Sequence, residues 1–360
     1  MHAPRLALAA MLVCLLGALG DVPVTRGAAR HTPATTMRLP NQRALPSLDG
    51  ATAWLGSRPL SASGLRGKVV VVDFSTYTCI NSIRMLPYVR AWAEKYRDKG
   101  VVVINVQAPE FEFEKNMDNV RRAVREQNID FPTAVDNDHA IWQAFDNAYW
   151  PALYIADAQG RIRYHHFGEG AYDESERMIQ QLLTEAGHTD VEPGLVSVHP
   201  RGLEAPADWN DLQTGETYVG YDRADNFASP GGAVRDKAHT YTAPDSLDVG
   251  QWALSGAWTI GHQGAVSQEA NARITFRFHA RDLHLVLGPA PNGTPVRFRV
   301  LVDGQAPGAA HGGDVDAQGN GTATEQRPYQ LIRQSPPIAD HTFEIEFLDT
   351  GAQAVVFTFG

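Results

Sequence analysis

The chain has 360 residues and a formal net charge of −10, with 43% hydrophobic and 20% charged residues. This composition is typical of a soluble globular protein and excludes a largely disordered chain, and the length suffices for two domains with filled cores. The acidic balance argues against nucleic acid as a partner.

The N-terminus predicts an export signal. Arg5 supplies a positive charge, residues 6–19 are nearly all apolar, and small residues follow. Because the apolar run is shorter than the roughly 20 residues of a membrane span, we expect residues 1–29 to be a cleaved signal peptide, which leaves no span. The protein is then periplasmic or secreted. Cys14 lies in this signal, so the mature chain keeps only Cys79 and cannot be a disulfide scaffold.

An α/β domain is predicted next. Residues 30–66 are rich in Pro, Ser, Arg and Gly and are expected to form an extended lead-in. From 67 to 188, buried-strand and helical patterns alternate and end in a hairpin and a helix, which indicates a mixed sheet covered by helices. The predicted strands are 68–74, 101–106, 131–135, 152–156 and 161–166, and the predicted helices are 86–96, 113–128, 140–145 and 173–186.

The rest of the chain predicts a second domain of a different class. Residues 189–241 are rich in Gly, Pro and Asp and are expected to be a linker and loops. From 242 to 360 apolar residues alternate with polar ones between turn residues, which indicates an all-β sandwich or jelly roll. Its predicted strands are 274–278, 283–287, 296–300, 343–347 and 355–359.

Cys79 lies between a predicted buried strand and a predicted helix. Free backbone N–H groups and the helix dipole stabilise a thiolate at such a position, so we expect the pKa of the thiol to be lowered. Asp73 ends the strand, where a partly desolvated carboxylate can exchange protons with the thiol. The alternative is a buried, inert cysteine of the core.

These residues resemble the thioredoxin family. Cys79 follows Asp73 by six positions, and Pro87 follows Cys79 by eight. Trp150-Pro151 matches the family's cis-proline, which packs against the active-site cysteine, so the resemblance implies a cis bond there. The long segment between Cys79 and Pro151 resembles the insertion in TlpA-like proteins and in peroxiredoxins of the AhpC/TSA type.

The resemblance is closer to the C-terminal periplasmic region of the DipZ proteins and covers nearly the whole mature chain. It implies a soluble relative whose second domain is a carbohydrate-binding-like sandwich that binds a carbohydrate or a protein. The motifs that carry it are Thr76–Asn81, Ala108–Phe111, Phe113–Lys115, Tyr149–Pro151, Phe167–Gly170, Trp252–Gly256 and Phe357–Gly360.

Ser82 stands where the redox-active form of the family has its second cysteine. A serine hydroxyl is too basic to attack a disulfide at neutral pH, so one chain cannot complete the usual dithiol cycle. We expect Cys79 to exchange with a disulfide-bearing protein or a small thiol, without a cofactor or metal. Two alternatives stay open, a one-cysteine peroxidase and a redox-inactive binding or scaffold protein that uses the second domain.

Further residues are assigned around Cys79. The resemblance to TlpA-like proteins implies that Glu110 tunes the thiol, the alternative being a solvated loop carboxylate. Tyr77, Trp150, Pro151 and Ser82 are expected to shape the substrate groove. Aromatic residues of the second part of the chain are either core residues or stacking surfaces for a ligand: Trp209, Tyr218, Tyr221, Trp252 and Trp258.

Overall fold

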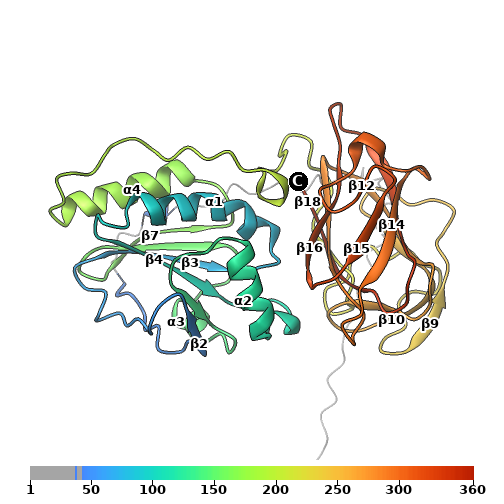
Figure 1. Ribbon diagram of the computed structural model, residues 1–360, viewed down its shortest axis with the longest axis horizontal. Helices are drawn as coiled ribbons and strands as arrows, with labels where there is room; N and C mark the ends of the chain where they lie inside the picture. The colour runs from blue at the N-terminus through green and yellow to red at the C-terminus, as the bar shows by residue number, and fades with distance from the viewer. Residues whose placement is uncertain (1–36, 39–42) are drawn as a thin grey trace, which may run out of the picture.

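The computed structural model describes residues 37–38 and 43–360, so the predicted signal peptide with Cys14 lies outside the described residues. Two domains lie side by side (Figure 1). The first combines a sheet with helices in a thioredoxin-like α/β fold, and the second is a large antiparallel β domain, which confirms the predicted fold class. No helix in the described part of the chain is long and apolar enough to cross a bilayer.

The sheet of the first domain has β3 (Val69–Ser75) near its centre. Among the described residues the strand order is β1-β7-β6-β3-β4-β5-β2. Strand β3 pairs in parallel with β4 and antiparallel with β6, so the predicted mixed sheet is confirmed. The other strands are β1 (Met37–Arg38), β2 (Ala53–Leu55), β4 (Val101–Gln107), β5 (Thr133–Val135), β6 (Ala152–Ala156) and β7 (Ile162–Phe167).

Helices cover both faces of this sheet (Figure 1). Alternating residues of β3 point to opposite faces, so Val69 and Val71 pack with Trp92 of α1, whereas Val70 and Val72 pack in the opposite core. The second core also takes up buried leucines from the expected lead-in, which is therefore part of the domain. The helices are α1 (Ile80–Lys95), α2 (Met117–Glu126), α3 (Ala140–Ala144) and α4 (Tyr172–Glu185), with a 3₁₀ turn η1 (Glu112–Lys115).

The second domain is antiparallel, with strand order β15-β14-β17-β12-β10-β11-β18-β13-β16 among the described residues. All five strands predicted there are present. The interval 189–241 is more than linker and loops, because β8 pairs with β18 and β9 pairs with β10. The strands are β8 (Thr217–Tyr218), β9 (Ala238–Tyr241), β10 (Trp252–Ile260), β11 (Ala265–Ser267), β12 (Ala272–His279), β13 (Asp282–Gly288), β14 (Val296–Val302), β15 (Asn320–Ala323), β16 (Arg327–Arg333), β17 (Asp340–Phe347) and β18 (Gln353–Phe359), and the 3₁₀ turns are η2 (Gly202–Glu204) and η3 (Gly308–Ala310).

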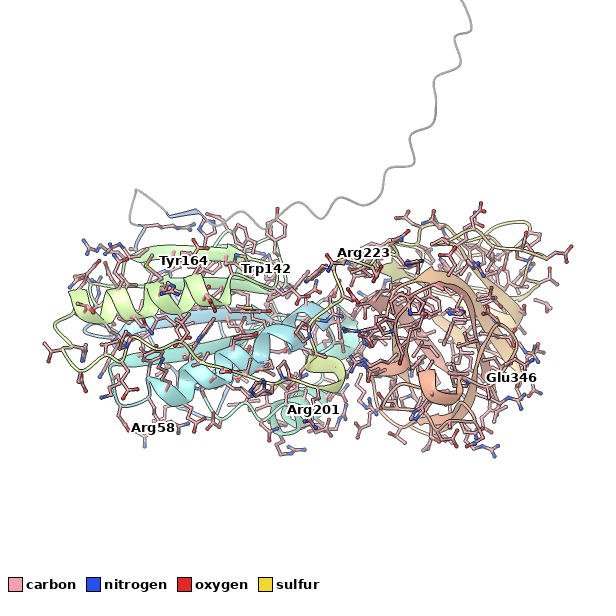
Figure 2. All side chains as sticks on the ribbon, turned by 90° about the horizontal axis from the view of Figure 1, so that it is seen from above. Arg58, Trp142, Tyr164, Arg201, Arg223 and Glu346 are labelled. Atoms are coloured by element: carbon pink, nitrogen blue, oxygen red, sulfur yellow. The ribbon has the colours of Figure 1, made fainter. Side chains whose placement is uncertain are left out.

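The two domains share a packed interface near the start of α1. Phe111, which follows β4, is buried against Val286 and Val356 of the second sheet. Arg223 of the second domain lies at the junction (Figure 2) and places its guanidinium over the Phe111 ring. The second domain therefore covers the edge of the first at which Cys79 lies.

Candidate functional site

Cys79 forms the N-cap of α1, directly after the turn that follows β3. It is a free thiol with partial exposure, and its Sγ lies 3.9 Å from the main-chain oxygen of Trp150. The Trp150–Pro151 bond is cis, so the cis-proline that the resemblance implied is confirmed. The structure thus brings together the predicted strand, cysteine and proline.

The expected lowering of the thiol pKa is wrong. The pKa of Cys79 is raised to about 12, first because protein atoms surround the sulfur, and then because the carboxylates of Glu110 and Glu216 oppose a thiolate. The backbone N–H and the hydroxyl of Ser82 lower it by a smaller amount. The favourable position at a helix N-terminus is therefore outweighed by desolvation and by the carboxylates of Glu110, which the family resemblance had indicated, and Glu216, which nothing in the sequence had indicated.

Asp73 lies inside β3, which continues to Ser75, and is buried, whereas the sequence predicted it at the end of the strand and only partly desolvated. Burial raises the pKa of its carboxyl to about 7, and its Oδ1 has no hydrogen-bond partner among the described residues. The buried Ser82 hydroxyl likewise lacks a hydrogen bond of normal geometry in that part of the chain. A carboxyl with this pKa can accept or release a proton near neutral pH.

Glu110 is held by the second domain and is not a solvated loop carboxylate. Its Oε1 accepts hydrogen bonds from the Tyr218 hydroxyl and from Arg223 Nη1, each at 2.8 Å. The Arg223 guanidinium also lies over the Tyr218 ring, 3.7 Å from its centroid. The predicted action of Glu110 on Cys79 is present and raises the pKa of the thiol.

A second buried carboxylate, Glu114 of η1, ties the Cys79 turn to the Glu110 loop. Its Oε1 accepts from the Thr78 hydroxyl, and its Oε2 accepts from the backbone N–H groups of Glu110 and Phe111 at 2.6 and 2.9 Å. Burial raises the pKa of Glu114 to about 6. In the sequence, the motif Phe113–Lys115 contributed only to the resemblance to the DipZ proteins, and no role was predicted for Glu114.

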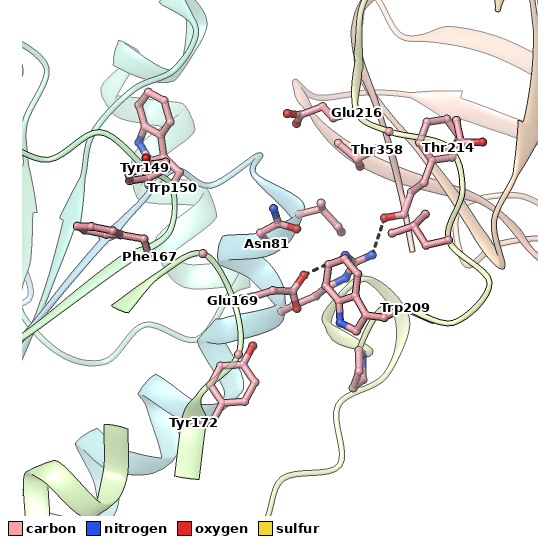
Figure 3. Close-up of a pocket in the computed structure, with 18 of the residues that line it drawn as sticks. Asn81, Tyr149, Trp150, Phe167, Glu169, Tyr172, Trp209, Thr214, Glu216 and Thr358 are labelled. Carbon is pink, nitrogen blue, oxygen red and sulfur yellow. Dashed lines mark hydrogen bonds and ion pairs between the residues drawn. The ribbon is translucent and has the colours of Figure 1, made fainter. Parts of the chain in front are cut away.

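A cleft of about 830 Å³ opens between the domains beside Cys79. Ile80 and Trp150 contribute to its wall from the first domain, and Glu216 and Phe359 from the second. Figure 3 shows Glu216 on the second domain's side of the cleft and Tyr149 and Trp150 on the side of the first domain. A substrate that reaches the thiol from this cleft therefore contacts both domains.

The structure places only some of the predicted groove residues in the wall of the cleft, and others are buried. Trp150 lines the cleft and donates from Nε1 to the Ala108 oxygen at 3.0 Å, while Pro151 is buried behind it. Tyr77 is not a groove residue, because its side chain is buried against Val120 of α2 and lines neither of the described clefts.

Several site residues come from the interval predicted as linker. Glu216, Tyr218 and Arg223 all act on the Cys79 region, and no local motif marks them. Trp252 and Trp258, considered as stacking surfaces, are core residues with exposures of 1% and 0%. The described residues contain no group of three or more metal-ligating side chains placed to hold an ion.

Comparison with known families divides the chain as the structure does. Residues 39–182 match the Redoxin family, and residues 214–360 match the family described as thioredoxin like C-terminal domain. DipZ of Mycobacterium tuberculosis is 38% identical over 260 residues, which cover 70% of this chain and 36% of DipZ. The chain thus spans about a third of the length of that relative.

Two further relatives cover the first domain alone. The thiol-disulfide oxidoreductase YkuV of Bacillus subtilis is 28% identical over 141 residues, which is 39% of this chain and 95% of YkuV. The solution structure of a thioredoxin-like protein in the oxidized form has 29% identity and a TM-score of 0.37, covering 40% of this chain and 97% of that protein. The chain therefore contains a Redoxin domain over residues 39–182 and a thioredoxin like C-terminal domain over residues 214–360.

Proposed function

We propose that the protein is a thiol oxidoreductase that acts through the single thiol of Cys79 on disulfide-bearing proteins or small thiols. The observation that carries the proposal is the partly exposed Cys79 at the start of α1, beside the cis Trp150–Pro151 bond and next to a cleft that both domains line. The sequence similarity of the first domain to the thiol-disulfide oxidoreductase YkuV supports the same class of reaction.

The proposed reaction is an exchange of sulfur partners. Cys79 loses its proton, for which Asp73 is the proposed acceptor, and its sulfur attacks one sulfur of a substrate disulfide. The substrate S–S bond breaks, a mixed disulfide forms on Cys79, and the other substrate sulfur leaves and is protonated. Since Ser82 cannot resolve this bond, an external thiol attacks it, restores the Cys79 thiol and leaves with the substrate half as a new disulfide.

The experiment follows formation of the mixed disulfide by intact mass. Purified protein is incubated with a neutral disulfide and then with excess small thiol, alongside the variants C79S and S82C. We expect one reversible adduct per chain in the parent and none in C79S. In S82C the new cysteine lies next to Cys79, so we expect a disulfide within the chain and turnover without a trapped adduct. A parent protein that forms no adduct even at alkaline pH would refute the proposal.

A second candidate is a binding protein without redox turnover. The raised pKa of Cys79 favours it, because a thiol that stays neutral is a poor nucleophile. In that case a disulfide-free peptide would bind in the cleft equally well to the parent and to C79S. The peroxidase alternative has no observation of its own in its favour, because the raised pKa of Cys79 opposes the thiolate in an attack on peroxide as much as in an attack on a disulfide.

The place of action and the ligand of the second domain are also proposals. Residues 1–29 support export, which places the thiol in an oxidising compartment where substrate disulfides persist.

We take the substrate chain as the proposed ligand of the second domain, because that domain lines the cleft at Glu216 and Phe359. A carbohydrate ligand for this domain stays a prediction from the sequence.

A further inference from the structure

Tyr218 bridges two carboxyl groups at the domain interface. Its hydroxyl lies 2.8 Å from Glu110 Oε1 and 2.9 Å from Glu216 Oε2. A phenolic hydroxyl carries one hydrogen, so it can donate to only one of these oxygens. The other contact is a hydrogen bond only if that carboxyl is itself protonated and donates to the Tyr218 oxygen. The bridge therefore holds one carboxylate and one neutral carboxyl group.

The contacts decide which group carries the proton. Glu110 Oε1 also accepts from Arg223 Nη1, and this ion pair stabilises Glu110 as the charged member. Among the described residues no cation forms an ion pair with Glu216, which faces the charge of Glu110, so Glu216 is the member that keeps a proton. The protein atoms around its carboxyl group and the Glu110 charge raise the pKa of Glu216 to about 7, while the residue as a whole is exposed to solvent.

Glu216 is also placed where a leaving group would emerge. It lines the cleft together with Ile80 and Trp150, the neighbours of Cys79, and once ionised it raises the pKa of the thiol. In Figure 3 it extends from the second domain's side into the space opposite Tyr149 and Trp150. In a disulfide attacked by Cys79 the second sulfur leaves on the side away from the thiol, and a substrate seated in this cleft would place that sulfur there.

We propose that Glu216, supplied by the second domain and held by the Tyr218–Glu110 bridge, is the general acid that protonates the leaving sulfur during exchange at Cys79. This inference rests on the proposed function. The Cys79 sulfur bonds to the near substrate sulfur, the S–S bond breaks, and its electron pair goes to the far sulfur, which takes the proton of Glu216. The resulting carboxylate lies close to Glu110, and their repulsion favours recovery of a proton from solvent.

The test compares three reagents for Cys79 on the whole protein and on E216Q. The leaving sulfur of 2-hydroxyethyl disulfide is strongly basic and needs a proton, that of 4,4′-dithiodipyridine is weakly basic, and iodoacetamide releases iodide, which needs none. Near pH 6.5, we expect E216Q to slow exchange with 2-hydroxyethyl disulfide at least about tenfold and to change the dithiodipyridine rate by less than about threefold. Alkylation should be unchanged, because Glu216 is largely neutral at this pH and the loss of iodide needs no proton.

The pH dependence gives a second readout. Above about pH 7 Glu216 loses its proton, so the parent and E216Q should converge at pH 9 with the aliphatic disulfide. In the E110Q background the charge that raises the pKa of Glu216 is absent, so convergence should occur at lower pH. E126Q, which changes an exposed carboxylate of α2, is the matched control and should behave as the parent does.

The outcomes separate this inference from the proposed function. If the parent reacts with all reagents and E216Q slows none of them, or slows all three equally, Glu216 is not the general acid while thiol exchange stands. If neither disulfide reacts with the parent and alkylation still occurs, the proposed function fails and the inference fails with it.

Discussion

Arg84 of α1 donates a hydrogen bond from Nη2 to the main-chain oxygen of Phe359 in β18, over 3.0 Å. The same side chain, 2% exposed, forms an ion pair with Glu169 at 3.2 Å. One buried guanidinium thus connects the helix that starts at Cys79 with the last strand of the second domain, and it fixes the wall of the cleft on both sides.

Replacing Arg84 by methionine should destabilise the protein by about 3 kcal/mol, because the Glu169 carboxylate loses its partner in a buried setting. Urea unfolding followed by tryptophan fluorescence measures the loss. The double variant R84M/E169Q should recover part of it, since no unpaired charge remains. R90M is the matched control on the same helix: its ion pair with Glu204 is partly exposed and should contribute less than about 1 kcal/mol. Equal losses for R84M and R90M would contradict the prediction.

Asp73 should make the stability of the protein fall as the pH rises. Its carboxyl has a pKa of about 7 in the folded chain, against 3.8 for an unperturbed aspartate, so between these values the folded state holds a proton that the unfolded state has lost. The stabilisation is complete below about pH 4 and is lost as the pH rises through 7. D73N, which stays neutral, should match the parent at low pH and exceed it by on the order of 3 kcal/mol above pH 7. Urea unfolding from pH 4 to pH 9 measures this, and a constant difference between the two proteins would disprove it.

Glu114 should be needed for the position of the Cys79 turn. E114A leaves the Thr78 hydroxyl and two backbone N–H groups without their acceptor, which should cost about 3 kcal/mol of stability. E114Q keeps one oxygen and should lose less. The exposed neighbour Glu112, changed to glutamine, is the control and should have little effect. Alkylation of Cys79 should become faster in E114A because the turn loosens, and an unchanged rate would show that Glu114 does not hold the thiol.

The order of strands and helices in the first domain could be predicted from the spacing of apolar residues along the chain. The valine run of β3 is typical of a buried central strand, and the apolar spacing after it predicted a helix over residues 86–96, which in the structure begins earlier, at Ile80. For the same reason, the alternating residues of β12 and β14 predicted strands of the second sheet. Strands without clear alternation were missed in the sequence, for example β16, in which five consecutive residues are buried.

The sequence by itself determined that one thiol stands at the active position of a thioredoxin-like domain, because Cys79, Ser82 and Pro151 are set by local order along the chain. Only the tertiary structure decided how reactive that thiol is. Glu216 lies far from Cys79 in sequence, and the second domain brings its carboxyl group close enough to raise the pKa of the thiol. A pKa depends on desolvation and on charges through space, and neither can be read from spacing along the chain.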